Sequence, residues 1–229
     1  MVIHHPKTVE EAVKLRHEID SSCYLSGGTE VLRLNSSIPA DCALIDISPL
    51  LDSSIIEKDD YVYIGSGATL QMIKESALVP DFIREAASFC SSFEKRNSAT
   101  AAGNIALRRD DSYMLASLVA AEAELVIECH SGEKIKPITV YIAKNCKAVI
   151  KYIRVPAGRK GWSKKFALTA SSHAALIAAS SEGNYALSVS GSAFCYGKDK
   201  DLYRNMEFAD NLQGSAEYKK YLASTVFES

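Results

Sequence analysis

The sequence predicts an α+β fold, in which helices alternate with short strands near the start of the chain and antiparallel strands dominate further along. Residues 8–47 carry a helix, a strand, a glycine turn and a second strand in that order. Two β-rich runs at residues 124–129 and 134–138 are joined through Gly132, as in a hairpin. Three later runs have the spacing of an antiparallel meander; they cover residues 164–170, 173–179 and 185–189.

The composition is that of a globular protein of one to two domains, with 229 residues of which 47% are hydrophobic. The 26 basic and 28 acidic residues give a formal net charge of -2, so no global positive field is available to attract nucleic acid or anionic lipid. No apolar run reaches the roughly 18 residues that span a bilayer, and the first residues lack the apolar core of a signal peptide. We therefore expect a cytoplasmic protein with no nucleic-acid or membrane partner.

The cysteines and histidines favour neither a metal site nor an iron–sulfur cluster. No pair of cysteines forms a C-x-x-C motif, and the five histidines have no ligand spacing. We expect reduced thiols, several of them within apolar stretches. The six cysteines are Cys23, Cys42, Cys90, Cys129, Cys146 and Cys195.

The N-terminal elements begin with a capping box, in which Thr8 and Glu11 are spaced to satisfy free amides at the start of a helix. Apolar residues follow at helical spacing, which supports the helix. Residues 23–25 have the pattern of a short buried strand, residues 31–34 that of a short helix and residues 43–47 that of a second strand. Together they predict a small α/β unit.

The middle of the chain predicts a strand, two helices, a loop and a third helix. The corresponding ranges are residues 61–65, 70–76, 80–89, 91–105 and 111–121. Residues 148–155 then predict a strand, and residues 156–161 a domain boundary. Beyond the meander, residues 201–228 have apolar spacing that indicates two short helices.

Two glycine loops, residues 26–29 and 99–104, are candidate anion-binding sites. Glycines let backbone N–H groups approach an anion closely, and threonine and asparagine add side-chain donors. The loops lie far apart in the sequence, so both would have to converge on one ligand, and a pyrophosphate is long enough to engage both. The alternative is that each loop is only a tight turn.

A third loop, residues 64–69, follows a predicted strand and suggests a Rossmann motif built on Gly65 and Gly67. The third glycine of that motif is replaced by Leu70, and no acidic residue ends a following strand. A nicotinamide-dependent Rossmann enzyme therefore remains an alternative with partial support. The motifs of P-loop proteins, serine hydrolases and zinc proteases are absent.

Four segments, in the same order, resemble the FAD-binding subunits of molybdopterin-containing hydroxylases, the xanthine dehydrogenase and carbon monoxide dehydrogenase medium-subunit group. They are residues 26–30, 63–69, 96–105 and 214–222. The resemblance implies a two-subdomain FAD-binding domain of the type shared with vanillyl-alcohol oxidase-like flavoproteins. That domain would span residues 1–160, with subdomains of about 1–55 and 56–160. A shortened C-terminal domain of antiparallel strands and helices would follow at 161–229.

The resemblance also implies the cofactor-binding residues. The first two glycine loops would hold the FAD pyrophosphate, residues 64–69 would lie near the flavin, and Lys165 would lie close to the isoalloxazine ring. A positive charge there stabilises the anionic reduced flavin; the alternative is a solvated lysine on an edge strand. No catalytic residue is assigned. The implied residues are Ser26, Gly27, Gly28, Thr29, Glu30, Gly65, Thr69, Thr100, Ala102, Gly103, Asn104 and Lys165.

Several positions depart from the family pattern. Ala102 replaces a usual glycine, which would cost strain if that position needs a positive φ. Tyr113 stands where an aspartate near the FAD ribose is usual, and Thr169 and Ala170 replace an arginine pair. These departures leave open a second alternative, a non-catalytic scaffold subunit that keeps the fold and has lost FAD.

The function implied by the resemblance is that of an FAD-carrying subunit in a molybdenum hydroxylase-like oxidoreductase, active only in complex. A molybdopterin-binding large subunit would oxidise the substrate, and an iron–sulfur small subunit would pass the electrons on. FAD on this chain would then reduce NAD or another acceptor. The cofactor carries the chemistry, and the protein supplies orientation and electrostatics.

Overall fold

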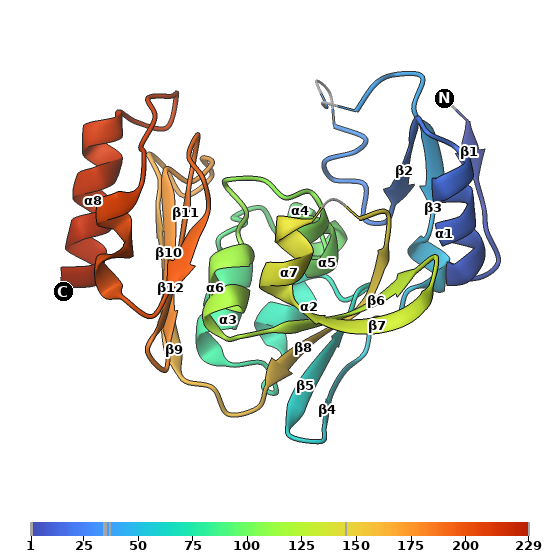
Figure 1. Cartoon of the computed structure of the whole chain (residues 1–229), viewed down its shortest axis with the longest axis horizontal. Helices are drawn as coiled ribbons and strands as arrows, with labels where there is room; N and C mark the ends of the chain where they lie inside the picture. The colour runs from blue at the N-terminus through green and yellow to red at the C-terminus, as the bar shows by residue number, and fades with distance from the viewer. Residues whose placement is uncertain (1, 34–35, 37, 145, 229) are drawn as a thin grey trace.

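The structure is a computed structural model that describes residues 2–33, 36, 38–144 and 146–228. Three sheets follow one another along the chain, with the N-terminal sheet at one side of the molecule and the C-terminal sheet at the other (Figure 1). Helices fill the space between the central and C-terminal sheets, so the structure confirms the predicted mixture of helices and mainly antiparallel sheets.

The first sheet contains β1 (Ile3–His4), β3 (Ala43–Asp46) and β2 (Ser22–Leu25) in that spatial order, all parallel. The helix α1 (Val9–Glu18) packs on it through Ala12 and Val13. The predicted N-cap is confirmed, because the Thr8 hydroxyl accepts a hydrogen bond from the Glu11 amide at 3.2 Å. The Glu11 carboxylate, however, accepts from the amide before the cap instead of the cap itself.

The central sheet is antiparallel throughout and has the order β4-β5-β8-β6-β7. Its strands are β4 (Ile55–Lys58), β5 (Tyr61–Gly65), β6 (Glu124–Cys129), β7 (Gly132–Pro137) and β8 (Val149–Pro156). The helices of this region gather on one face of the sheet and form the largest core of the molecule with it. They are α2 (Leu70–Glu75), α3 (Asp81–Ser88), α4 (Phe93–Ser98), α5 (Ala101–Ala106), α6 (Leu115–Ala120) and α7 (Ile138–Ala143).

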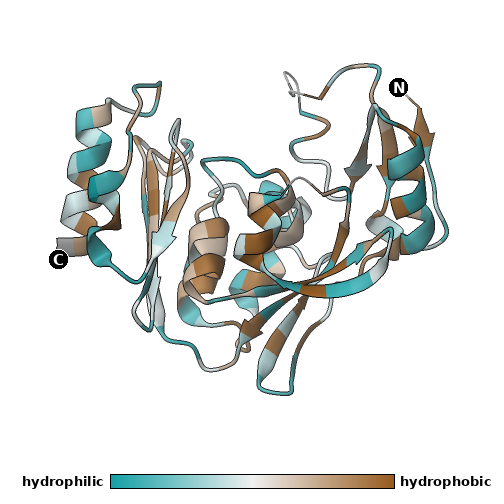
Figure 2. Ribbon diagram, viewed as in Figure 1, coloured by the Kyte–Doolittle hydropathy of each residue, from teal (hydrophilic) through white to brown (hydrophobic). Residues whose placement is uncertain are grey.

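The last sheet is an antiparallel meander of β9 (Gly161–Phe166), β10 (Leu176–Ser181), β11 (Asn184–Val189) and β12 (Cys195–Gly197). The long helix α8 (Ala216–Glu228) covers one face, and α6 packs on the other. All six residues of α6 are buried, which agrees with its mainly hydrophobic colour in Figure 2. All six residues of β10 are buried as well.

Several predicted elements differ from the structure. The largest correction concerns residues 91–105, which form α4 and α5 instead of a loop, because Ser92 and Thr100 cap these helices by accepting from the amides of Lys95 and Gly103. Residues 28–33 form a turn instead of the predicted short helix, and Leu34 lies outside the described residues. The first meander strand begins at residue 161, not 164, and the second at 176, not 173.

Candidate functional site

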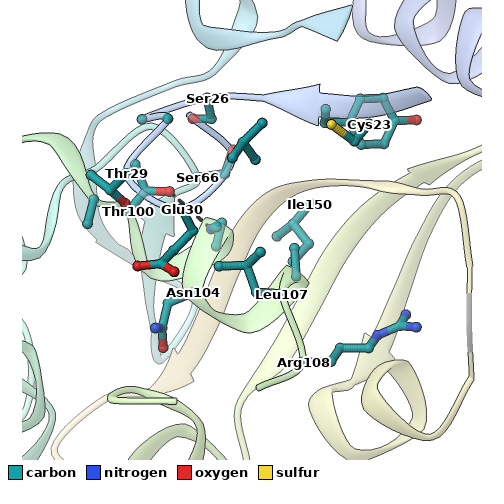
Figure 3. Close-up of a pocket in the computed structure, with 18 of the residues that line it drawn as sticks. Cys23, Ser26, Thr29, Glu30, Ser66, Thr100, Asn104, Leu107, Arg108 and Ile150 are labelled. Carbon is teal, nitrogen blue, oxygen red and sulfur yellow. Dashed lines mark hydrogen bonds between the residues drawn. The ribbon is translucent and has the colours of Figure 1, made fainter. Parts of the chain in front are cut away.

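A cavity of about 410 Å³ lies between the first sheet, α5 and β8, within the size range of small-molecule and cofactor sites. Figure 3 shows part of its lining, with the loop after β2 on one side and α5 on the other. The cavity brings together most of the residues that sequence analysis singled out: Ser26, Gly27, Gly28, Thr29, Glu30, Thr100, Ala102, Gly103 and Asn104. Three predicted residues, Gly65, Thr69 and Lys165, are not part of its lining.

The loop after β2 needs its two glycines for different reasons. A Cβ added to Gly27 would lie 1.8 Å from the backbone oxygen of Ser98, so only glycine allows the loop to touch the end of α4. Gly28 has a φ of +69°, in the left-handed region. Within the described part of the chain, the amides of Gly27, Gly28 and Thr29 meet no hydrogen-bond acceptor. These amides are available to a ligand.

The start of α5 forms the opposite side of the cavity. The Thr100 hydroxyl accepts from the Gly103 amide at 3.0 Å, so this amide serves the helix cap, while the Ala102 amide meets no acceptor among the described residues. Ala102 lies inside the helix and is not among the residues with positive φ, so alanine causes no strain here. The Asn104 side-chain oxygen accepts from the Ser112 hydroxyl at 2.6 Å and from the Met114 amide at 3.1 Å, which orders the chain before α6.

In the third loop, after β5, the backbone amides are hydrogen-bonded to other parts of the backbone. The amides of Gly65, Ser66 and Gly67 donate to the backbone oxygens of Ser54, Lys151 and Asp52, at 2.9, 3.0 and 2.8 Å. β5 pairs only with antiparallel neighbours, whereas a Rossmann unit needs parallel strands. This geometry does not support the Rossmann alternative.

The side chains on either side of this loop differ in what they contact. Thr69 caps α2, because its hydroxyl accepts from the Met72 amide at 3.2 Å. Leu70 then donates its amide to the Ala99 oxygen at 2.8 Å, which ties the start of α2 to the start of α5. The one residue of the loop that lines the cavity is Ser66, which sequence analysis did not select.

A network of charged side chains is centred on Glu30, which lines the cavity. The Glu30 carboxylate pairs with Lys95 at 2.8 Å, with Arg109 at 3.2 Å and with Arg33 at 3.3 Å. Burial raises the pKa of Glu30, but the three cations outweigh it and the pKa is lowered overall. Glu30 therefore stays ionised and ties the first glycine loop to the helical region.

Asp111 extends the network to the segment between β9 and β10. Arg109 donates two hydrogen bonds to its carboxylate, at 2.7 and 2.8 Å, and His173 Nδ1 lies 2.8 Å from it. Burial raises the pKa of Asp111, and the paired Arg109 and His173 lower it by more. The residues after β9 are thereby joined to the same network. None of Asp111, Arg109 and His173 was selected as a site residue from the sequence.

Lys165 is not part of the cavity lining, but it lies close to a residue that is. Its ammonium donates to the backbone oxygens of Phe89 and Ala170, at 2.9 and 3.0 Å, and lies 5.5 Å from the centre of the Tyr113 ring. Burial lowers the pKa of Lys165. Lys165 does lie on an edge strand, β9, as the alternative interpretation has it, but it is bonded and half-buried instead of solvated. Tyr113 itself lines the cavity.

The charge of the cavity lining is opposite in sign to that of the whole chain. Five cationic side chains line it and two carboxylates do, whereas the chain has a net charge of -2. Such a local excess of positive charge favours an anionic ligand. The cations are Arg16, Lys95, Arg108, Arg109 and Lys147.

Neither a metal-ligand cluster nor a membrane-spanning helix occurs among the described residues. No group of three or more histidine, cysteine, aspartate or glutamate side chains is placed there to hold a metal ion. The helices that the structure describes include none with the length and apolar character needed to cross a membrane.

Comparison with protein families and curated proteins gave two results. The family model described as "FAD binding domain in molybdopterin dehydrogenase" matches residues 1–158. The uncharacterized protein YgfM of Escherichia coli strain K12 is 31% identical over 148 residues, which are 63% of this chain and 55% of that protein. The same protein from Escherichia coli O157:H7 gives the same values. The match thus spans about half the length of these relatives.

Solved structures resemble the whole chain. The Cu,Mo-CO dehydrogenase in its cyanide-inactivated form has a TM-score of 0.85 at 19% identity, over 99% of this chain and 94% of that one. Carbon monoxide dehydrogenase from Hydrogenophaga pseudoflava, in a form lacking the Mo-pyranopterin moiety, has a TM-score of 0.84 at 24% identity, over 100% of this chain and 94% of that one. Quinoline 2-oxidoreductase from Pseudomonas putida 86 has a TM-score of 0.83 at 15% identity, over 100% of this chain and 94% of that one. At these identities the likeness establishes the fold.

Proposed function

The chain belongs to the family of FAD-binding domains of molybdopterin dehydrogenases, and we propose that it is the FAD-carrying subunit of a molybdenum hydroxylase-like oxidoreductase. FAD is the cofactor of this family. The observation that carries the proposal is the pair of unsatisfied donor groups on opposite sides of one cavity: the amides of Gly27, Gly28 and Thr29 on one side and that of Ala102 on the other.

The residues present fit a dinucleotide. A diphosphate needs donors and positive charge, and the cavity offers free amides on both sides and an excess of cations. The close approach of Gly27 to Ser98 brings the two donor groups together, and any side chain at position 27 would prevent it. When bound, FAD supplies the redox chemistry.

The chain's own residues then have distinct roles. The amides of loop 26–29 and of Ala102 bind the diphosphate, and the Glu30 network fixes the loop that carries most of them. Asn104 orders residues 112–114, which places Tyr113 in the cavity wall. Lys165 is a positioning residue in this proposal: its ammonium contacts the Tyr113 ring and adds positive charge behind it, where it favours an anionic flavin.

The partners follow from the family. We infer a molybdopterin-binding large subunit and an iron–sulfur small subunit as the electron source, NAD or another acceptor as the electron sink, and activity only in the assembled complex in the cytoplasm. The support is that solved structures of the same fold come from a Cu,Mo-CO dehydrogenase and a quinoline oxidoreductase. Co-expression with candidate subunits, followed by cofactor analysis of the purified complex, tests this part of the proposal.

FAD binding is tested on the purified chain with two matched variants. Gly28 and Gly158 both have a φ of +69°, but only Gly28 lines the cavity, and a Cβ at Gly158 would meet no atom within 4 Å. Alanine at either position costs about 1–2 kcal/mol of backbone strain. We expect Gly28→Ala to weaken FAD binding at least tenfold in fluorescence titrations and Gly158→Ala to leave it unchanged.

Two outcomes contradict this assignment. Equal FAD affinity in both variants would show that the loop after β2 does not bind the cofactor. A wild-type chain that binds no FAD, alone or with its partner subunits, would favour the scaffold alternative, for which the replacements Tyr113 and Thr169 are the motivating observation.

A further inference from the structure

The Ser66 hydroxyl is a buried polar group without a partner. Ser66 is 1% exposed, and its Oγ makes no hydrogen bond within the described part of the chain. Native proteins satisfy nearly all such groups, so an exception calls for an explanation, such as a ligand that completes it. The neighbouring amides do not donate a hydrogen bond to this hydroxyl, because those of Gly65, Ser66 and Gly67 already have other acceptors.

Ser66 lies in the wall of the cavity. Ser66 lines it together with Ser26, Thr29 and Thr100, all of which are labelled in Figure 3. Its backbone cannot shift easily, because a Cβ at Gly65 would lie 2.3 Å from the Asp52 oxygen and the Ser66 amide is bonded to Lys151. Rotation about a single side-chain bond is the one movement left to aim the hydroxyl.

We propose that the Ser66 hydroxyl donates a hydrogen bond to a phosphate oxygen of the bound dinucleotide. The inference rests on the proposed function, because it requires a diphosphate in the cavity. Loop 65–68 contributes no backbone amide to the ligand, so its contribution is this side chain alone. A phosphate oxygen is the best acceptor for it, because a hydrogen bond to a charged group is stronger than one to a neutral hydroxyl.

A ligand-binding role and a structural role predict opposite effects on the ligand-free protein. If Ser66 serves the ligand, Ser66→Ala removes an unsatisfied group, and the ligand-free chain is as stable as wild type or more stable. If the hydroxyl served the fold, the same change would lower the melting temperature.

Ser117 provides the matched control. It is a fully buried serine outside the cavity whose Oγ lies 2.7 Å from that of Ser163, which joins α6 to β9. Ser117→Ala leaves the Ser163 hydroxyl unsatisfied, so we expect the melting temperature to fall by about 3 °C or more. Its affinity for FAD should equal that of wild type.

The experiment measures the melting temperature of the ligand-free chain, and the affinity for FAD and for ADP by calorimetric titration, in wild type and both variants. We expect Ser66→Ala to lose about tenfold or more in affinity for both ligands, by the same factor, with no loss of melting temperature. A loss for FAD without a loss for ADP would place the hydrogen bond on the flavin side and overturn the phosphate assignment.

The remaining outcomes separate this inference from the proposed function. If wild type binds both ligands and Ser66→Ala binds them equally well, the Ser66 inference is wrong and the proposed function stands. A lowered melting temperature of ligand-free Ser66→Ala also overturns the inference, because the hydroxyl then supports the fold. If wild type binds neither ligand, both proposals fail together.

Discussion

Two glycine loops of the same appearance, residues 26–30 and residues 65–68, differ in what their backbone does. The first leaves the amides of Gly27, Gly28 and Thr29 without an acceptor and is held by a side chain, Glu30. In the second loop, the amides of residues 65–67 donate to neighbouring backbone oxygens, and the Ser66 hydroxyl has no partner among the described residues. Glycine in a loop therefore does not identify an anion site. What identifies it is where the backbone hydrogen bonds go.

The charged anchor of the first loop gives the largest expected effect. Arg109→Leu leaves the Asp111 carboxylate, whose side chain is 7% exposed, without its two hydrogen bonds and removes one of the three cations around Glu30. Breaking a buried pair in this way costs about 3 kcal/mol of unfolding free energy. We expect that loss in urea denaturation, together with weaker FAD binding, because the first loop loses an anchor.

Arg159→Leu is the control for this variant. Arg159 also pairs with two carboxylates, those of Glu122 and Glu182, but these are 52% and 53% exposed and can return to water. We expect a cost of at most about 1 kcal/mol and unchanged FAD affinity. If the two arginine variants are equally destabilised, burial of Asp111 is not what makes the anchor strong.

Replacing the helix caps beside the two loops should have a smaller effect on stability, and the two caps are more alike than the two arginines are. Thr100 caps α5 beside the first loop and Thr69 caps α2 after the second, each by accepting from the amide three residues on. Alanine at either position costs about 1 kcal/mol of unfolding free energy. We expect only Thr100→Ala to weaken FAD binding as well, because only its helix offers a free amide to the cavity. Equal FAD affinity in the two variants would show that α5 does not contribute to FAD binding.

The fold was largely predictable, because most elements carry a local signal. The strand at residues 61–65 and the turn at residues 181–184 follow from alternation and glycine, and Glu182 and Gly183 have the positive φ of a two-residue hairpin turn. The short helices α4 and α5 were missed because their capping serine and threonine have the composition of a loop. The family resemblance carried by four motifs is confirmed by the family match.

The site was less predictable than the fold. The sequence indicated both loops of the cavity, because glycine and threonine are unusual in such density. It gave no sign of the ion pairs that join Glu30 to Arg109, Arg109 to Asp111 and Asp111 to His173, because ion pairs between loops far apart in the sequence leave no local pattern. Nor could it separate Gly65 from Gly27, since the acceptors that occupy one loop come from residues 52, 54 and 151.

Amide hydrogen exchange with and without FAD tests the central claim most directly. The account predicts that the amides of Gly27, Gly28, Thr29 and Ala102 exchange rapidly in the ligand-free chain and become protected when FAD binds. The amides of residues 65–67 should be protected in both states, because their acceptors are internal. New protection at residues 65–67, with residues 27–29 unchanged, would contradict the account.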